Sequence, residues 1–109
     1  MKRNLVIWIG CTVLIMTFAS CVTQNKETNE KEAKAYRRVG EAYLQQGNFA
    51  AAVREFKKAE AKNPEDHLLQ YDLGLVYFRL GKFDDAIAYY NKALELNPSY
   101  GPAINGLGN

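Results

Sequence analysis

Apolar residues recur along residues 33–63 at three- and four-residue steps, which is the spacing of one face of an α-helix. The first series consists of Tyr36, Val39, Gly40 and Tyr43. We expect this helix to end at Gly47, because glycine readily takes the left-handed conformation that follows many helix ends. A second series predicts a helix from about Phe49, with Ala52, Val53, Phe56 and Ala59 on its apolar face. Asn63-Pro64 should end that helix, since proline disfavours helical geometry in the residue before it.

The same plan repeats at a period of 34 residues. When residues 33–66 are set against 67–100, nine positions are identical. They are Gly40/Gly74, Tyr43/Tyr77, Gly47/Gly81, Phe49/Phe83, Ala52/Ala86, Lys58/Lys92, Ala59/Ala93, Asn63/Asn97 and Pro64/Pro98. Conservative pairs are Val39/Leu73, Val53/Ile87 and Phe56/Tyr90. Chance similarity does not keep glycine, alanine, aromatic and proline residues in register in this way, so the chain contains tandem helical hairpins.

A helix–turn–helix unit of this length resembles the tetratricopeptide repeat (TPR). The resemblance implies an all-α solenoid with TPR 1 at 33–66 and TPR 2 at 67–100. Because Leu107-Gly108 follows Leu73-Gly74 at the same period, residues 101–109 are predicted to be the truncated first helix of a third unit. About three units are needed for independent stability. We therefore favour a fragment of a longer TPR protein; the alternative is an outer face completed by a partner or a second copy.

Small residues are predicted to set the distance between helices. Gly40 and Gly74 lack side chains and let the two helices of a unit approach closely, and Ala52 and Ala86 should supply the small surface that faces them. The rings predicted to fill the space between units are Tyr43, Tyr77, Phe56 and Tyr90, each burying on the order of 150–250 Å². Gln70 departs from the pattern, since the position of Tyr36 usually holds a large aromatic residue in the family.

The N-terminal segment is organised like a secretory signal. Lys2 and Arg3 precede an uncharged apolar stretch at 5–18, which is followed by Ala19-Ser20-Cys21 and then by polar residues. The apolar stretch is shorter than the roughly 20 residues of a membrane-spanning helix. We predict a signal peptide at residues 1–20. The alternatives are an uncleaved signal anchor and ordinary secretion with Cys21 as an incidental thiol.

Small residues directly before a cysteine resemble the lipobox of bacterial lipoproteins, although Phe18 stands where that family usually has Leu. The resemblance implies lipidation of Cys21 and a lipid-anchored protein of the bacterial cell envelope that faces the periplasm. In some bacteria, an Asp directly after this cysteine retains a lipoprotein in the inner membrane. Here that position is Val22, which favours the outer membrane. Residues 21–32 are predicted to form a lipidated flexible tether, because this polar stretch has little apolar surface to bury.

Charge and cysteine usage exclude several classes of protein. Lys2 and Arg3 account for the net charge of +2, and the remaining 12 basic residues balance 12 acidic ones. Without a basic stripe to displace counterions from phosphate, we predict no nucleic-acid partner. Both cysteines, Cys11 and Cys21, lie before the repeats, which therefore hold no disulfide and no thiolate metal site.

The repeats also lack recognisable catalytic motifs. His67 is the only histidine and has no partner ligand nearby, so we expect a solvated surface residue. Glu65-Asp66 and Asp84-Asp85 stand at predicted helix starts, where the helix dipole favours negative charge. No phosphate-binding glycine loop or nucleophile motif is present. We predict a chain that is not an enzyme and that takes no cofactor, metal or small-molecule substrate.

TPR proteins bind a peptide or a partner helix in a concave groove lined by the first helix of each unit. By repeat register, the resemblance implies groove positions at Lys34, Arg37, Glu41, Leu44 and Gln45, and at Leu68, Tyr71, Leu75, Phe78 and Arg79. Tyr71, Leu75 and Phe78 form an apolar cluster beside Arg79, a composition typical of interface hot spots; the alternative is packing against a neighbouring unit. Glu41 and Leu75 occupy places where the carboxylate-clamp subfamily has Asn, so we expect no such clamp.

The function predicted from these features is a non-catalytic, membrane-anchored scaffold that binds another protein. Residues 43–49 and 72–77 resemble the type IV pilus biogenesis and stability lipoproteins, which implies a role in assembling a pilus or secretion complex. The alternative is an accessory interaction module of an envelope enzyme, such as one that acts on peptidoglycan.

Overall fold

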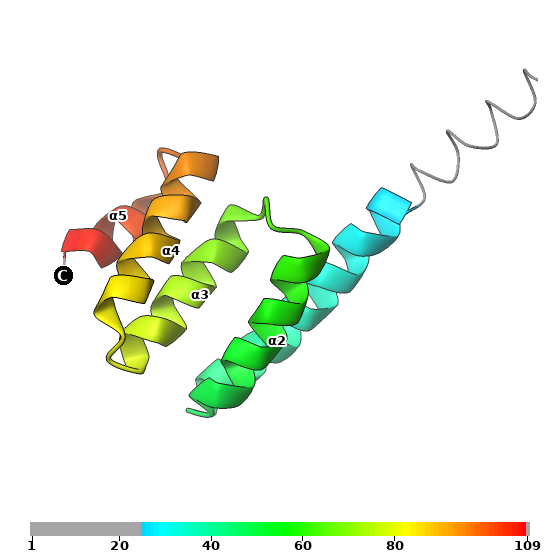
Figure 1. Ribbon diagram of the computed structural model, residues 1–109, viewed down its shortest axis with the longest axis horizontal. Helices are drawn as coiled ribbons and strands as arrows, with labels where there is room; N and C mark the ends of the chain where they lie inside the picture. The colour runs from blue at the N-terminus through cyan, green and yellow to red at the C-terminus, as the bar shows by residue number, and fades with distance from the viewer. Residues whose placement is uncertain (1–24, 109) are drawn as a thin grey trace, which may run out of the picture.

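The computed structural model describes residues 25–108, and all regular secondary structure in this range is helical. An N-terminal helix occupies residues 25–45. It is followed by α2 (Phe49–Lys62), α3 (His67–Arg79), α4 (Phe83–Leu96) and α5 (Gly101–Gly108). The helices form two hairpins stacked side by side, and α5 lies against the second (Figure 1). The predicted all-α solenoid of two hairpins and one further helix is confirmed for this range; the predicted signal peptide and Cys21 lie outside the described residues.

The turns form where the sequence places glycine. Gly47 and Gly81 have φ angles of 78° and 76°, in the left-handed region that L side chains rarely adopt. The amide of Asn48 donates to the Tyr43 carbonyl at 2.9 Å, which satisfies a carbonyl at the end of the N-terminal helix. At the start of α3, the Asp66 side chain accepts a hydrogen bond from Leu68 N at 3.0 Å. The predicted helix ends and the capping role of Asp66 are therefore confirmed.

Each hairpin closes by packing an aromatic ring onto a glycine. A Cβ atom on Gly40 would lie 2.5 Å from the ring of Phe56, and one on Gly74 would lie 2.6 Å from the ring of Tyr90. The predicted close approach is confirmed, and the atoms nearest to each glycine belong to an aromatic ring. Ala52 and Ala86, which were predicted to face these glycines, are buried in the same clusters as Phe56 and Tyr90.

The two hairpins share a continuous apolar core. Phe56 and Ala59 of α2 are grouped with Leu69, Leu73 and Val76 of α3, and all five are almost completely buried. Val39 is 45% exposed, whereas Leu73, at the same position of the second unit, is 0% exposed. The sequence placed both on apolar faces. They differ because Leu73 packs against the preceding unit, and no preceding unit is present among the described residues.

Gln70, which replaces the aromatic residue of the repeat, is completely buried. Its Nε2 donates to Glu60 Oε2 at 3.2 Å and to the Pro64 carbonyl at 3.1 Å, whereas its Oε1 accepts no hydrogen bond from the described residues. Gln70 therefore ties α3 to α2 through polar contacts at the place where Tyr36 of the first unit presents a ring.

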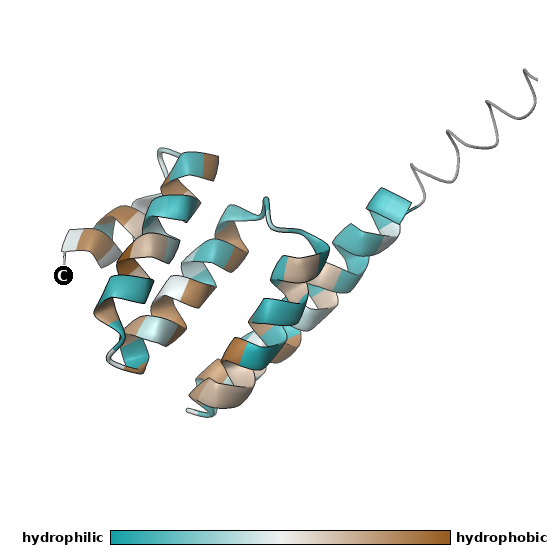
Figure 2. Cartoon of the chain, viewed as in Figure 1, coloured by the Kyte–Doolittle hydropathy of each residue, from teal (hydrophilic) through white to brown (hydrophobic). Residues whose placement is uncertain are grey.

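The prediction of a flexible tether was wrong for residues 25–32, which belong to the N-terminal helix. Their charged side chains form ion pairs that suit a helix, with Glu27 and Lys31 one turn apart at 3.7 Å and Glu32 bonded to Lys62 of α2 at 2.9 Å. Much of this stretch is hydrophilic (Figure 2). It is helical because it continues directly into residues that the hairpin buries, beginning with Ala33. Among the described residues, no helix has the length and apolar character needed to cross a membrane.

His67 was predicted to be a solvated surface residue, and this was wrong. It is half-buried, its ring packs edge-on against Tyr100 with centroids 4.9 Å apart, and its Nε2 lies 3.3 Å from Asn97 Nδ2. The segment between α4 and α5 returns to the start of α3 and covers the imidazole. His67 therefore has a packing role, because it holds the segment that leads into α5 against the start of α3.

Candidate functional site

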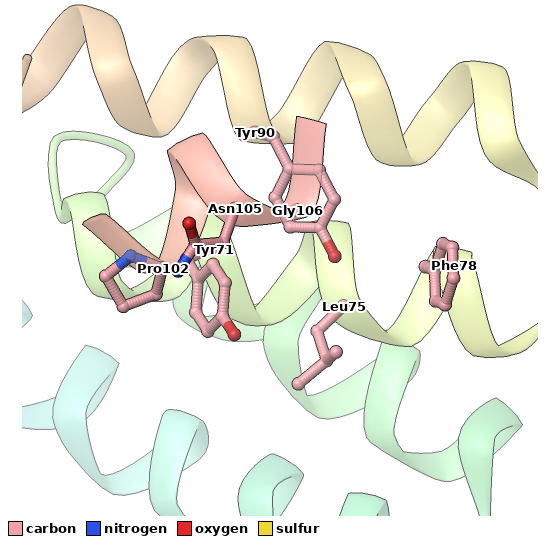
Figure 3. A pocket seen from close by; sticks show the side chains of 7 residues that line it. All are labelled: Tyr71, Leu75, Phe78, Tyr90, Pro102, Asn105 and Gly106. Carbon is pink, nitrogen blue, oxygen red and sulfur yellow. The ribbon is translucent and has the colours of Figure 1, made fainter. Parts of the chain in front are cut away.

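A pocket of about 280 Å³ lies beside α3, where the second hairpin meets α5. Tyr71, Leu75 and Phe78 of α3 form one wall, and Tyr90 of α4 projects toward the same space (Figure 3). Pro102, Asn105 and Gly106 of α5 complete the lining. Three helices therefore build this pocket, which we call the apolar pocket.

A second pocket, of about 620 Å³, lies between the first unit and α3. Its lining comprises Glu41, Leu44, Gln45, Gly47, Phe49, Leu75 and Arg79. We call it the charged pocket because it contains Glu41 and Arg79. Leu75 lines both pockets, so the two adjoin along α3. Together they form a groove that runs from the N-terminal helix to α5.

The structure brings most of the groove positions implied by repeat register into these two pockets. Glu41, Leu44, Gln45, Leu75 and Arg79 line the charged pocket, and Tyr71, Leu75 and Phe78 line the apolar pocket. Lys34, Arg37 and Leu68 line neither of them. Pro102 and Asn105 were missed, although they stand one period after Leu68 and Tyr71. Extending the register by one more unit would have found them.

The ring contacts of the apolar cluster come from residues 67–100, the second unit itself, so packing against a neighbouring unit stays an alternative for it. Tyr71 is half-buried, and its ring centroid lies 5.7 Å from that of Tyr90 and 5.5 Å from that of Tyr100. Phe78 is 38% exposed, and its ring packs edge-on against another exposed ring, that of Phe83, with centroids 5.5 Å apart. A ring on α4 and a ring in the segment before α5 therefore hold Tyr71 in place, whereas the Phe78 end of the pocket stays open.

An ion-pair cluster links the two units next to the groove. Arg37 of the N-terminal helix bonds through Nε to Asp72 Oδ2 at 2.6 Å and through a terminal guanidinium nitrogen to Glu41 Oε1 at 2.7 Å. Asp72 is buried, whereas Arg37 and Glu41 are half-buried. Burial lowers the pKa of Arg37, but the hydrogen bond to Asp72 and the nearby carboxylates more than offset this, so its pKa is raised. Arg37 thus stays charged and bridges two carboxylates.

Burial raises the pKa of the Asp72 carboxyl to about 6, and Arg37 opposes this rise only in part. The folded state therefore holds the Asp72 proton more tightly than the unfolded chain does. It follows that the free energy of unfolding should increase as the pH falls through 6 toward 4. Lowering the pH from 7.5 to 5 should add on the order of 1 kcal/mol from this group alone.

Asp72→Asn should remove this increment, because an amide does not titrate. The measurement is urea unfolding of both proteins at pH 7.5 and pH 5, with the change between the two pH values compared. Equal changes in the two proteins would show that Asp72 does not take up a proton in this range.

Within residues 25–108, no group of three or more His, Cys, Asp or Glu side chains is placed to hold a metal ion. The arrangement of this part of the chain favours recognition of another polypeptide: a groove with aromatic and aliphatic walls, two charged side chains and rigid helical edges.

The stacked hairpins and the groove along their first helices define the chain as an α-helical repeat protein of the solenoid class. The chain belongs to the tetratricopeptide repeat family, whose sequence profile matches residues 37–101. The family assignment made from the 34-residue period is thereby confirmed.

Relatives occur among large eukaryotic proteins. The chain is 32% identical over 78 residues to superkiller complex protein 3 of Mus musculus and 32% identical over 78 residues to tetratricopeptide repeat protein 37 of Xenopus laevis. Each match covers 72% of this chain and 5% of the relative, so the chain spans a small part of these proteins.

Similar structures include the crystal structure of MamA, with a TM-score of 0.69 and 32% identity over 71% of this chain and 45% of that one. The first TPR of Spaghetti (RPAP3), bound to the HSP90 peptide SRMEEVD, has a TM-score of 0.71 and 30% identity over 72% of this chain and 63% of that one. The match to a structure that is itself named a TPR agrees with the fold of the described residues.

Proposed function

We propose that this chain is a non-catalytic scaffold whose groove binds a segment of another protein. The observation that carries the proposal is the open apolar pocket, in which Tyr71, Leu75 and Phe78 are aligned along one helix in a position to meet a ligand. Support comes from a similar structure, the first TPR of Spaghetti, which holds a peptide. Aromatic residues in a pocket of this kind give large contact area at low entropic cost.

The combined variant Tyr71→Ala and Phe78→Ala should abolish peptide capture while the helical circular dichroism is retained. A random library of 12-residue peptides displayed on phage would be panned on the immobilised protein, and the captured clones would be tested on the variant. Since each ring removed from a hot spot typically costs about 2 kcal/mol of binding, the loss of both should weaken binding by roughly three orders of magnitude.

A matched control for this experiment is Val39→Ala combined with Leu96→Ala. These two side chains are 45% and 40% exposed and line neither pocket. Retained binding by the control and loss of binding by the groove variant support the proposal. Unchanged binding by the groove variant would show that the groove is not the binding site.

For localisation, we propose that Cys21 carries the lipid that anchors the scaffold to the bacterial envelope, with the repeats in the periplasm and the outer membrane as the favoured site. The support is the charged, apolar and small-residue order of residues 1–21. Two acyl chains on one cysteine anchor a protein stably, whereas one chain alone does not. A role in assembling a pilus or secretion complex is a narrower proposal, supported by the likeness of residues 43–49 and 72–77 to that lipoprotein family.

Cys21→Ser should move the full-length protein from the membrane fraction to the soluble fraction, because the thiol that accepts the lipid is lost. The measurement is fractionation after metabolic labelling with a radioactive fatty acid, and Cys11→Ser serves as the control. Label on the Cys21→Ser protein, or label lost from the Cys11→Ser protein, would contradict lipidation at Cys21.

A further inference from the structure

Of the two charged side chains that line the groove, one is already in an ion pair and the other is not. Its lining contains one acidic and one basic side chain, Glu41 and Arg79. Glu41 is already bound to Arg37 at 2.7 Å. Arg79 is exposed and forms no ion pair with a carboxylate of the described residues. The guanidinium of Arg79 is therefore the charge that the groove leaves open to a ligand.

The positive charge of Arg79 also reaches the apolar pocket. Burial raises the pKa of the Tyr90 hydroxyl, and Arg79 acts in the opposite direction, which places its charge within electrostatic range of the ring that closes the pocket. Tyr71, Leu75 and Arg79 follow one another at four-residue steps and so lie on one face of α3. A ligand lying along this face meets apolar walls and then a cation.

The apolar pocket is preformed. Tyr71 is held by the rings of Tyr90 and Tyr100, and Pro102 fixes the opposite wall on α5. Little conformational entropy is lost when a ligand binds to a preformed site, so a single bulky side chain can act as an anchor. Its volume of about 280 Å³ is small for anything larger than one or two side chains. The site suits a linear segment better than the flat face of a folded domain.

We propose that the partner of this groove is an acidic linear segment, which inserts a bulky apolar side chain into the apolar pocket and places a carboxylate against Arg79. This inference rests on the proposed function and specifies its ligand. Arginine is suited to the task because its planar guanidinium forms paired hydrogen bonds with carboxylates. A basic segment is disfavoured, since the one carboxylate of the groove is already neutralised by Arg37.

The spacing of the two anchors follows from the geometry of α3. Arg79 stands four residues after Leu75 and eight after Tyr71, which corresponds to about 6 Å and 12 Å along the helix. An extended peptide advances by roughly 3.3 Å per residue. The acidic residue of the partner should therefore lie about two to four residues from its bulky apolar residue.

The test is selection of 12-residue peptides from a random phage library on the wild-type protein and on Arg79→Glu in parallel. Wild type should enrich peptides that carry a large apolar residue and an Asp or Glu at the stated spacing. Arg79→Glu should enrich Lys or Arg at that position and bind the wild-type peptides at least tenfold more weakly, measured by fluorescence anisotropy. Arg54→Glu makes the same charge change on an exposed part of α2 and should bind like wild type.

Peptides without an excess of acidic residues, or peptides that bind Arg79→Glu within twofold of wild type, would overturn the acidic-segment inference. In that case the proposed function still stands if Tyr71→Ala with Phe78→Ala abolishes binding. If that groove variant binds like wild type, or if no peptide is enriched, both the inference and the proposed function are contradicted.

Discussion

Phe56→Ala is expected to lower the free energy of unfolding by about 3–5 kcal/mol, the range for deleting a buried aromatic ring. Phe56 is 0% exposed, and its ring lies over Gly40 while packing in the core that joins the two hairpins. Because no side chain at Gly40 can move in to fill the space, the cavity should stay open. The measurement is urea unfolding followed by far-ultraviolet circular dichroism.

Phe83→Ala is the matched control, since it removes the same ring from a site that is 57% exposed. Its ring touches Phe78 at the surface, and the loss should be about 1 kcal/mol or less. If the two variants lose equal stability, the core between the hairpins is not organised around Phe56 as described.

Gly74→Ala is expected to lower the free energy of unfolding by about 2–3 kcal/mol, although alanine is the better helix former. The added Cβ would meet the Tyr90 ring at 2.6 Å. That ring cannot move away freely, because on α5 a Cβ at Gly106 would meet the same ring at 2.9 Å. Tyr90 is thus enclosed between two glycines, and a methyl group at Gly74 must push α3 and α4 apart.

Gly108→Ala is the matched control, and by the same measurement its free energy of unfolding should not fall. A Cβ at Gly108 meets nothing within 4 Å, so the helix propensity of alanine should leave stability unchanged or raise it by up to about 1 kcal/mol. A destabilisation of similar size in both variants would mean that crowding against Tyr90 is not what selects glycine at position 74.

The period of the sequence was sufficient to predict the hairpins, because each repeat obeys local rules. Gly47 and Gly81 supply a positive φ that few other residues tolerate, and Pro64 forces the preceding residue out of helical geometry. The same register predicts Leu44, Tyr71 and Leu75 along the groove, and all three line its two pockets. Signals of this kind lie within a few residues of the feature that they predict.

Features that depend on distant contacts were not predicted. The ion pair between Arg37 and Asp72 joins two units, and neither residue has an equivalent in the other repeat. The burial of His67 requires Tyr100, which directly precedes α5, to return to the start of α3. The helical state of residues 25–32 depends on continuation into the buried hairpin, whereas their composition alone is that of a disordered segment.

The central claim is that the inner side of the stacked hairpins binds another polypeptide. Its most direct test is site-specific photo-crosslinking of the full-length protein in its native cell, with the reactive amino acid placed at Leu75 in the groove or at Asn91 on the exposed side of α4. We predict a discrete adduct with one other protein at Leu75 and none at Asn91. Adducts at Asn91 in the absence of any at Leu75 would contradict the claim.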